Sequence, residues 1–239
     1  MGIGTDGLLE VVDEADSTNR LALERAAAGA PNGTVVVARR QTAGRGRQGR
    51  TWFSDEGALT LSVIVRGHGV DGLLPLRAGL AVARTAGSSA RVKWPNDVLV
   101  EGRKVAGILV EAVPSSPTAP GERAAVVGIG LNVAVDLAAL PAEVAARAGS
   151  LGRGIEELDA VRDQLLVELT DALALDGPTI VASLGSRDAL AGRAIAWTAS
   201  EGGARSEGHA EGIDPDGQLR VRLPDGELVH LAGGEVHLS

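Results

Sequence analysis

The chain has 239 residues, enough to bury a sizeable core in one large domain or in one domain with a small companion. Its net charge of −8 makes a general affinity for DNA or for an anionic membrane unexpected, so any phosphate binding must be local. The absence of cysteine excludes disulfides, and the lack of a long apolar run or a signal peptide predicts a cytoplasmic protein.

The N-terminal part of the chain predicts strands on either side of one helix. The apolar run at 8–12 predicts the first strand. The cap-type residues DSTN at 16–19 precede a stretch rich in leucine and alanine, which predicts a helix that ends at Gly29. The apolar runs at 34–39 and 58–65 predict two further strands. These segments indicate a sheet that begins near the N-terminus.

The middle of the chain adds a helix and more strands. Small and apolar residues recur at helical spacing over 73–87. The segment 92–113 predicts two strands around a tight EGRK turn, with the dipeptide WP at 94–95 as an extended bend. A polar, proline-rich connection at 114–121 leads to a buried strand at 124–133. The sheet should therefore be mixed rather than purely parallel.

The sequence pattern of the C-terminal part differs from that of the preceding residues. Residues 141–185 supply helical material, whereas short alternating stretches split by PDG turns follow Gly185. These stretches predict a small barrel of five strands and about 50 residues. We therefore predict an α+β protein in which a mixed sheet with helices at 1–187 is followed by a small β-domain at 188–239.

The loop QTAGRGRQGRTWF at 41–53 joins two of the predicted strands. Glycine lets a backbone approach an anion closely, and the forked donors of arginine suit phosphate oxygens. The loop could also be a solvated surface segment, although its single copy between strands does not favour an RNA-binding tract. Five arginines and no acidic residue lie between positions 39 and 50, namely Arg39, Arg40, Arg45, Arg47 and Arg50. This cluster predicts a focused positive patch that suits a polyphosphate or an acyl phosphate.

Lysine is scarce, and this scarcity is informative. Only Lys93 and Lys104 occur beside 21 arginines, so each marks a site where a compact ammonium is needed. Lys93 opens KWPND at 93–97, and Lys104 lies after the predicted turn. The two should lie on neighbouring strands of one hairpin and point toward one cavity. Exposed hairpin charges are the competing interpretation. Aromatic residues are equally scarce, and the full set is Trp52, Phe53, Trp94 and Trp197.

Five motifs in this order resemble the catalytic domain of biotin protein ligases. They are DSTN at 16–19, QTAGRGRQGRTWF at 41–53, KWPNDV at 93–98, GRKVAGILVE at 102–111 and GIGLNV at 128–133. The stretches GID-PDGQL and GGEVHL are similar to the small SH3-like domain of that family. The resemblance implies a mixed-sheet catalytic domain of the class II aminoacyl-tRNA synthetase kind and a C-terminal SH3-like barrel. Lipoate-attaching enzymes share the fold but generally lack GRGRxGR together with KWPND.

The resemblance also implies a reaction in two steps. The carboxylate of biotin attacks the α-phosphate of Mg-ATP and gives biotinyl-5′-AMP, so ATP and biotin are expected as substrates together with Mg²⁺. A lysine of a biotin carboxyl carrier domain of acetyl-CoA (acyl-CoA) carboxylase then attacks the mixed anhydride. A homodimer is allowed. The chain leaves no room for an N-terminal helix-turn-helix, so DNA is not expected as a partner. A membrane is not expected either, because of the net charge of −8.

The resemblance assigns a biotin pocket to hydroxyl, amide and cationic side chains. Helix capping is the competing interpretation for Ser17 and Thr18. The loop around Gly46 is expected to order over the ligand. The complete biotin set is Ser17, Thr18, Asn19, Gln41, Arg45, Gly46, Arg47 and Lys104.

The resemblance assigns the nucleotide to a second group of residues. Trp52 matches a position that can cover the adenine, with core packing as the competing interpretation and as the preferred one for Trp94. Gly130 and Asn132 could instead shape only a strand end. The complete nucleotide set is Arg45, Arg47, Arg50, Trp52, Lys93, Asn96, Lys104, Gly130 and Asn132.

Catalytic roles are implied for four residues, Lys104, Arg47, Lys93 and Asp97. Lys104 matches the lysine that binds both the biotin carboxylate and the α-phosphate, which makes it the expected electrostatic catalyst. Lys93, Asn96 and Asp97 should position phosphate, metal or the incoming amine, and the sequence does not divide these roles. No protein residue is expected to hold a resident metal ion, because the histidines at 68, 209, 230 and 237 lie outside the motifs without metal-ligand spacing. They are expected on the surface or in the small barrel.

Two alternatives stay open at this point. An enzyme of the same fold could use another acyl substrate, such as lipoate or octanoate. A non-catalytic module that binds biotin or a nucleotide could have a regulatory role, although the intact loop and lysine motifs argue against it.

Overall fold

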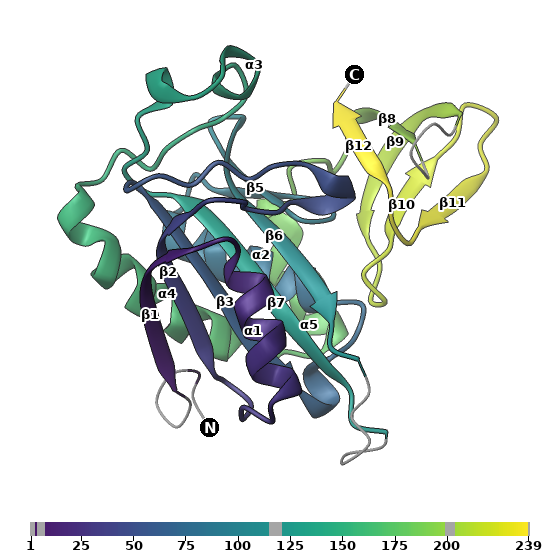
Figure 1. The fold of residues 1–239 in the computed structure, drawn as a ribbon. Helices are drawn as coiled ribbons and strands as arrows, with labels where there is room; N and C mark the ends of the chain where they lie inside the picture. The colour runs from purple at the N-terminus through teal and green to yellow at the C-terminus, as the bar shows by residue number, and fades with distance from the viewer. Residues whose placement is uncertain (1–2, 4–7, 115–120, 199–203, 239) are drawn as a thin grey trace.

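A mixed β-sheet forms the centre of the first part of the chain (Figure 1). The computed structural model describes residues 3, 8–114, 121–198 and 204–238. Within these residues the sheet has seven strands in the order β1-β2-β3-β7-β6-β5-β4. β1 runs parallel to β2, and every other neighbouring pair is antiparallel. The strands are β1 (Leu9–Ala15), β2 (Val35–Gln41), β3 (Ala58–Arg66), β4 (Arg91–Lys93), β5 (Asp97–Val100), β6 (Arg103–Ala112) and β7 (Ala124–Asn132).

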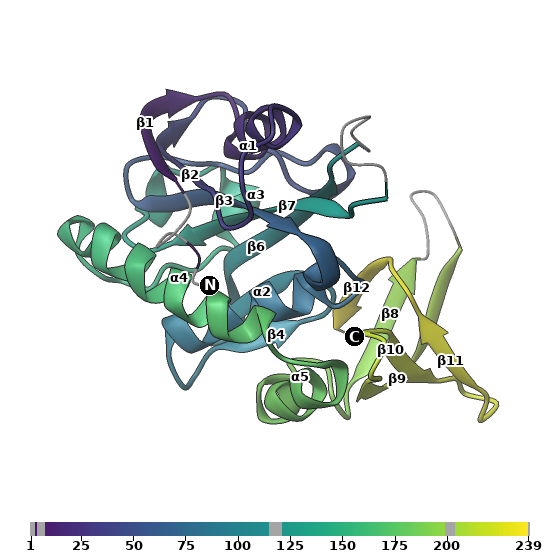
Figure 2. The ribbon, with the colours of Figure 1, turned by 90° about the horizontal axis from the view of Figure 1, so that it is seen from below.

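The sheet has two unlike faces because side chains alternate along its strands. Val35 of β2 and Leu61 of β3 point into the main hydrophobic core. Val36 and Ile64 point to the opposite face, where they pack with Ala22 of α1 (Thr18–Ala27). Seen from below, α1 lies over one face, whereas α2, α4 and α5 lie on the other side of the sheet (Figure 2). The face that carries α1 is the one on which the candidate site is built.

The helices on the core side pack in two layers. α2 contacts β4 to β7 as well as α4 and α5, and Leu80 of α2 and Leu165 of α4 are fully buried. The side chain of Asp176 caps α5 by accepting a hydrogen bond of 2.9 Å from the Thr179 N–H. The helical prediction for 141–185 is correct only in part, because residues 146–154 form no helix. The core-side helices are α2 (Leu74–Ala86), α4 (Leu158–Leu173) and α5 (Gly177–Leu184), whereas the short α3 (Ala142–Ala145) has no buried residue and lies beside the cavity described below.

A second, antiparallel sheet forms the C-terminal domain. Its five strands in the described residues follow the order β11-β10-β9-β8-β12. The two PDG turns place Gly217 and Gly226 at φ values of 85° and 91°, where a side chain would be strained. The α+β class and the small SH3-like domain are thus confirmed. The strands are β8 (Ala194–Thr198), β9 (Arg205–Ile213), β10 (Leu219–Arg222), β11 (Leu228–Leu231) and β12 (Glu235–Leu238).

The connection between the sheets is attached to β4. The Ala189 N–H donates a hydrogen bond of 2.9 Å to the carbonyl oxygen of Val92. Trp94, which is only 2% exposed, donates from Nε1 to the carbonyl oxygen of Gly217 at 2.9 Å. The boundary proposed between residues 187 and 188 lies in this connection. The preferred interpretation of Trp94 as a packing residue is therefore supported, and its ring also joins the two domains.

One prediction about local structure is wrong. The segment 92–113 contains parts of three strands rather than two, because β4 pairs with β5 and β5 pairs with β6. Lys93 lies at the end of β4 and Lys104 in β6, so β5 separates them and they do not share one hairpin. Most of the proline-rich connection predicted at 114–121 lies outside the described residues. No helix in the described part of the chain is long and apolar enough to cross a membrane.

Replacing the indole of Trp94 should weaken the junction. Trp94→Phe keeps an apolar ring but removes the N–H that Gly217 accepts, and it leaves unfilled volume in the core. We expect the free energy of unfolding in urea to fall by about 1–3 kcal/mol. Trp197→Phe makes the same exchange inside the small sheet and serves as the control. Equal or larger destabilisation by the control would contradict a special role for Trp94 at the junction.

Candidate active site

A cavity of about 660 Å³ opens between the loop at 41–53, the α1 face of the sheet and the small domain. It collects the residues that the sequence analysis proposed for the site, although they come from five separate stretches of the chain. The residues brought together are Ser17, Thr18, Asn19, Gln41, Arg45, Gly46, Arg47, Arg50, Trp52, Lys93, Asn96, Asp97, Lys104, Gly130 and Asn132.

The floor of the cavity depends on glycines in β6 and β7. A Cβ atom on Gly128 would lie 1.9 Å from Oδ1 of Asn19, and one on Gly130 would lie 2.3 Å from Cε2 of Trp52. Each distance is far below van der Waals contact, so neither position accepts a side chain without displacing its neighbour. The GIGLN motif is therefore a spatial requirement of the site as well as part of a strand.

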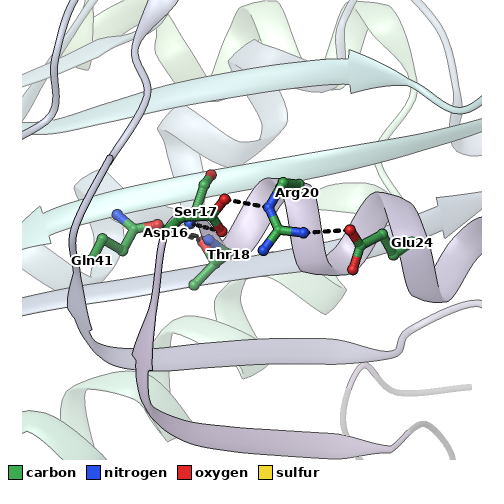
Figure 3. A network of polar contacts seen from close by, with 6 residues as sticks. All are labelled: Asp16, Ser17, Thr18, Arg20, Glu24 and Gln41. Atoms are coloured by element: carbon green, nitrogen blue, oxygen red, sulfur yellow. Dashed lines mark hydrogen bonds and ion pairs between the residues drawn. The ribbon is translucent and has the colours of Figure 1, made fainter.

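Buried polar side chains form one end of the cavity. The Thr18 N–H donates to Oε1 of Gln41 at 2.8 Å, and Figure 3 shows these two residues turned toward each other. Oγ of Ser62 lies 2.8 Å from Oγ1 of Thr18 and 2.6 Å from Oδ1 of Asn19. All but Gln41 are at most 4% exposed. Polar groups so deeply buried must find partners, which fixes their positions.

The start of α1 leaves Ser17 available to the cavity. Ser17 occupies the N-cap position of α1, but its side chain makes no capping hydrogen bond, so this competing interpretation is not realised. Its N–H instead donates to Oδ1 of Asp16 at 2.7 Å. Arg20 bridges Asp16 and Glu24 along the exposed side of the helix (Figure 3), and its hydrogen bond holds the pKa of Asp16 below the usual value.

The loop folds back on itself above the cavity. An antiparallel bridge joins Arg45 to Thr51, and the Gly46 N–H donates to the carbonyl oxygen of Arg50 at 2.7 Å. Gln48 adopts a left-handed backbone with φ 56°, at the tip of the short turn 47–49. Arg45, Arg47 and Arg50, which lie in and beside this turn, therefore project toward different parts of the site.

Three contacts hold these arginines. Nη1 of Arg47 donates to Oδ1 of Asn96 at 2.9 Å, which connects the loop to the KWPND segment. Arg45 pairs with Glu111 of β6 at 3.3 Å, and Arg50 pairs with Glu235 of β12. The loop thus contacts the sheet, the KWPND segment and the small domain together.

Lys104 faces Asp97 across β5 and β6. Its Nζ lies 2.6 Å from Oδ1 of Asp97 and 5.9 Å from the centre of the Trp52 ring. Burial lowers the pKa of Lys93, the attraction of Asp97 partly opposes this, and the charge of Lys104 adds to the decrease. Although the two lysines are not hairpin neighbours, both line the same cavity.

Trp52 lies inside the site rather than in the main core. Its ring contacts the positions of Gly107 and Gly130, where a Cβ would come within 3.3 and 2.3 Å. Its Nε1 is buried without a hydrogen-bond partner among the described residues. Trp52 therefore lies over the glycine floor with an unused donor.

The far wall was missed by the sequence analysis. Leu140, Glu143, Val144 and Arg147 line the cavity. The last three come from the stretch 141–185, which was predicted only as helical material, and Leu140 directly precedes it. This wall is hydrogen-bonded to β6, because the Lys104 N–H donates to the carbonyl oxygen of Arg147 at 2.8 Å and the Gly149 N–H donates to that of Lys104 at 2.7 Å. Nδ2 of Asn132 donates to the carbonyl oxygen of Gly149 at 2.9 Å. No motif in the sequence marked these residues.

The small domain supplies another part that was missed. Residues 234–238 line the cavity, and among them Glu235 pairs with Arg50. Burial of Glu235 opposes ionisation, but the hydrogen bond and charge of Arg50 outweigh it and the pKa of Glu235 is lowered. Nε2 of His237 lies 3.5 Å from Oε1 of Glu235. His237 belongs to the small barrel, as expected, and it also lines the cavity, which the sequence did not indicate. The only sequence feature that could have indicated these residues was the GGEVHL stretch, which resembles the small domain of the family.

The cavity can therefore hold two anions against preformed cations. Arg45, Arg47, Arg50, Lys93 and Lys104 converge on it in a protein of net charge −8. Cations positioned in advance need little reorganisation when a negatively charged reactant approaches another. Within the described ranges no group of three or more His, Cys, Asp or Glu side chains could hold a metal ion.

Comparisons with known proteins agree with this geometry. Residues 11–132 match the model of the biotin/lipoate A/B protein ligase family, and residues 192–239 match that of the biotin protein ligase C-terminal domain. The chain is 36% identical to the biotin acetyl-CoA-carboxylase ligase of Mycobacterium tuberculosis, over 96% of this chain and 89% of that protein. It is also 36% identical to the ligase of that name from Paracoccus denitrificans, over 90% of this chain and 94% of that protein.

A solved structure is similar over both domains. The biotin protein ligase of Aquifex aeolicus, in complex with biotin and ATP, superimposes with a TM-score of 0.82 at 27% identity, and the match covers 97% of this chain and 99% of that one. The motifs occur in the expected order and line one cavity, and the matches span both parts of the chain. We conclude that the chain belongs to the biotin protein ligase family.

Proposed function

We propose that this chain activates biotin with ATP and transfers the biotinyl group to a lysine of a carrier domain. In the first step a carboxylate oxygen of biotin attacks the α-phosphorus of ATP, and pyrophosphate leaves to give biotinyl-5′-AMP. In the second step the lysine nitrogen attacks the acyl carbon, AMP leaves, and the new amide nitrogen loses a proton. The observation that supports this most strongly is that one cavity runs along β6 from a polar pocket to Lys104.

The polar end suits the ureido ring of biotin. A ureido group offers two N–H donors and one carbonyl acceptor, which need partners when water is excluded. Thr18, Asn19 and Gln41 supply hydroxyl and amide groups there, in positions fixed by their contacts with each other and with Ser62. The aliphatic chain of the ligand would run from this end toward Lys104, on the cavity side of the Trp52 ring that covers the glycine floor.

The cationic end suits the reacting anions. Nζ of Lys104 lies beside Gly107, so it reaches back toward the polar pocket. It would bind both the carboxylate and the α-phosphate and reduce their mutual repulsion. Arg45, Arg47 and Arg50 would surround the phosphates as the loop closes. Exclusion of water by this loop protects the mixed anhydride from hydrolysis.

Lys93, Asn96, Gly130 and Asn132 would line the nucleotide and phosphate part of the site. Asp97 would position Lys104, which it contacts at 2.6 Å. Trp52 lies beside Lys104, where its ring could stack on the adenine. These assignments divide the cavity into a biotin end, a reacting centre and a nucleotide end.

Mg²⁺ would arrive with ATP. This ion keeps several waters and is commonly held by one or two carboxylates and by substrate phosphates. Asp97 supplies a carboxylate in the cavity, whereas the described residues form no larger metal-ligand cluster. The residues present therefore fit an ion that is carried by the nucleotide.

The expected partner is the biotin carboxyl carrier domain of an acetyl-CoA (acyl-CoA) carboxylase, with the reaction in the cytoplasm. Relatives named as acetyl-CoA-carboxylase ligases support this partner. Residues 1–187 would form the catalytic domain and 188–239 the small domain. A homodimer stays a prediction of the family resemblance.

Incubation with ATP and radiolabelled biotin tests the function directly. Formation of biotinyl-5′-AMP, and of labelled carrier once an apo-carrier domain is added, is the expected result. The same assay with lipoate and octanoate covers the alternative of another acyl substrate of the same fold. Adenylation of lipoate without adenylation of biotin would overturn the proposal, and so would biotin binding without any adenylate.

Lys104→Ala should lower the rate of adenylate formation by about a hundredfold or more, because it removes the cation placed at the reacting centre. The fold should stay intact, since the side chain lies in the cavity rather than in the core. Rates of pyrophosphate exchange, together with circular dichroism, would measure both effects. A near-normal rate would show that the central charge lies elsewhere.

Arg47→Ala should speed the loss of biotinyl-5′-AMP from the enzyme by about tenfold, because the loop loses its charged hydrogen bond to Asn96. Release is measured by filtration of a preformed complex. Arg39→Ala removes an exposed arginine of β2 outside the loop and is the control. Equal release from all three proteins would contradict the closing-loop role.

Lys93→Met should change how stability depends on alkaline pH. Because the pKa of Lys93 is lowered by burial, the unfolded chain binds more protons between that lowered pKa and the ordinary 10.5. The wild-type free energy of unfolding should rise with pH through this window, and Lys93→Met should remove that part of the rise. Urea titrations at several pH values would measure it, aided by the absence of tyrosine and cysteine. Identical pH slopes would refute the effect.

A further inference from the structure

Glu111, at the end of the GRKVAGILVE motif, contacts two parts of the site without lining the cavity itself. Its Oε2 accepts a hydrogen bond of 2.7 Å from Nδ2 of Asn19. Its Oε1 lies 3.3 Å from Nη2 of Arg45 in the loop. The one carboxylate therefore contacts both the polar pocket and the loop that covers it.

The charge of Glu111 fixes the orientation of the Asn19 amide. A carboxylate only accepts hydrogen bonds, so the NH₂ group of Asn19 must face Glu111. The same NH₂ group also donates to the carbonyl oxygen of Leu109 at 3.3 Å. Oδ1 of Asn19 is then left facing Ser62 as an acceptor, at 2.6 Å.

The orientation of the Asn19 amide determines the hydrogen-bond directions of Ser62 and Thr18. The single hydroxyl proton of Ser62 must go to Oδ1 of Asn19, because that oxygen can only accept. The Thr18 hydroxyl has one proton and two neighbouring acceptors, Oγ of Ser62 at 2.8 Å and Oε1 of Gln41 at 3.2 Å. Because Ser62 has already donated its own proton, the shorter contact requires Thr18 to donate to Ser62 rather than to Gln41. The free lone pairs of Thr18 are left as acceptors, which is the polarity that the N–H groups of a ureido ring need. Ser62 is fully buried, so water does not compensate a reversed direction.

We propose that Glu111 is a positioning residue that sets the donor and acceptor direction of the biotin pocket and, through Arg45, couples that pocket to the loop. The proposal rests on the proposed biotin-binding function of the cavity. The carboxylate of Glu111 has two separate effects. Acceptance from Asn19 supports biotin affinity, whereas the ion pair with Arg45 slows the escape of the adenylate.

Two substitutions separate these effects. Glu111→Met keeps the length of the side chain but removes both contacts. Glu111→Gln keeps an amide oxygen for Asn19 and turns an uncharged NH₂ group toward Arg45, so only the ion pair is lost. The matched controls are Glu10→Met and Glu10→Gln, because Glu10 joins β1 to α1 through Arg25 at 2.7 Å, away from the cavity.

Calorimetric titration with biotin in the absence of ATP, and the rate of loss of biotinyl-5′-AMP, are the two readouts. Glu111→Met should weaken biotin binding about tenfold and speed adenylate loss, whereas Glu111→Gln should speed the loss with binding weakened less than about threefold. The rate of adenylate formation at saturating biotin should change little in either, since Lys104 is untouched. The Glu10 variants should resemble the wild type in both readouts.

The outcomes distinguish this proposal from the proposed function. A wild-type protein that forms biotinyl-5′-AMP, together with a Glu111→Met variant of unchanged biotin affinity, would overturn only the role of Glu111. An equal loss of affinity in Glu10→Met would do the same, because it would show a general weakening of α1. A wild type that neither binds biotin nor forms the adenylate would overturn both.

Discussion

The cross-strand pair of Gly107 and Gly130 is the constraint on which the site depends. With no side chains at these positions, β6 and β7 leave a floor that the Trp52 ring and the end of Lys104 can occupy. Gly128, two residues before Gly130 in β7, likewise leaves space for the side chain of Asn19. If a side chain filled this space, β6 and β7 could not move away to make room, because their other face lies on the packed core. The cavity is thus a property of the sheet itself.

Three of the five cations around this floor pair with a carboxylate. Lys104 contacts Asp97, Arg45 contacts Glu111 and Arg50 contacts Glu235. These partners hold long, flexible side chains in place, which lowers the entropy that an anionic substrate would otherwise have to remove. An incoming phosphate competes for, or shares, donors that are already oriented. The acidic total charge of the chain therefore coexists with a cationic cavity.

The fold and most of the site could be predicted because their signals are local. Strand runs, helical spacing and ordered motifs identified both domains and fifteen residues that line one cavity. Ser62 and Glu111 could not be assigned this way. Ser62 lies in an ordinary strand pattern, Glu111 ends a motif that did not distinguish it, and each contacts residues more than 40 positions away. Likewise β4 has only three residues, too few for a recognisable alternation, and this caused the error about the lysine hairpin.

The contacts at the junction make the small domain part of the site. The Trp94 indole is buried against Gly217, and the Ala189 N–H donates to the carbonyl oxygen of Val92 at 2.9 Å. Both contacts lie next to the strand that carries Lys93, and Glu235 reaches the loop through Arg50. If the small domain shifted, a buried indole N–H would lose its acceptor and the loop would lose an anchor at the same time. The orientation of the small domain and the position of the loop at 41–53 are therefore energetically coupled.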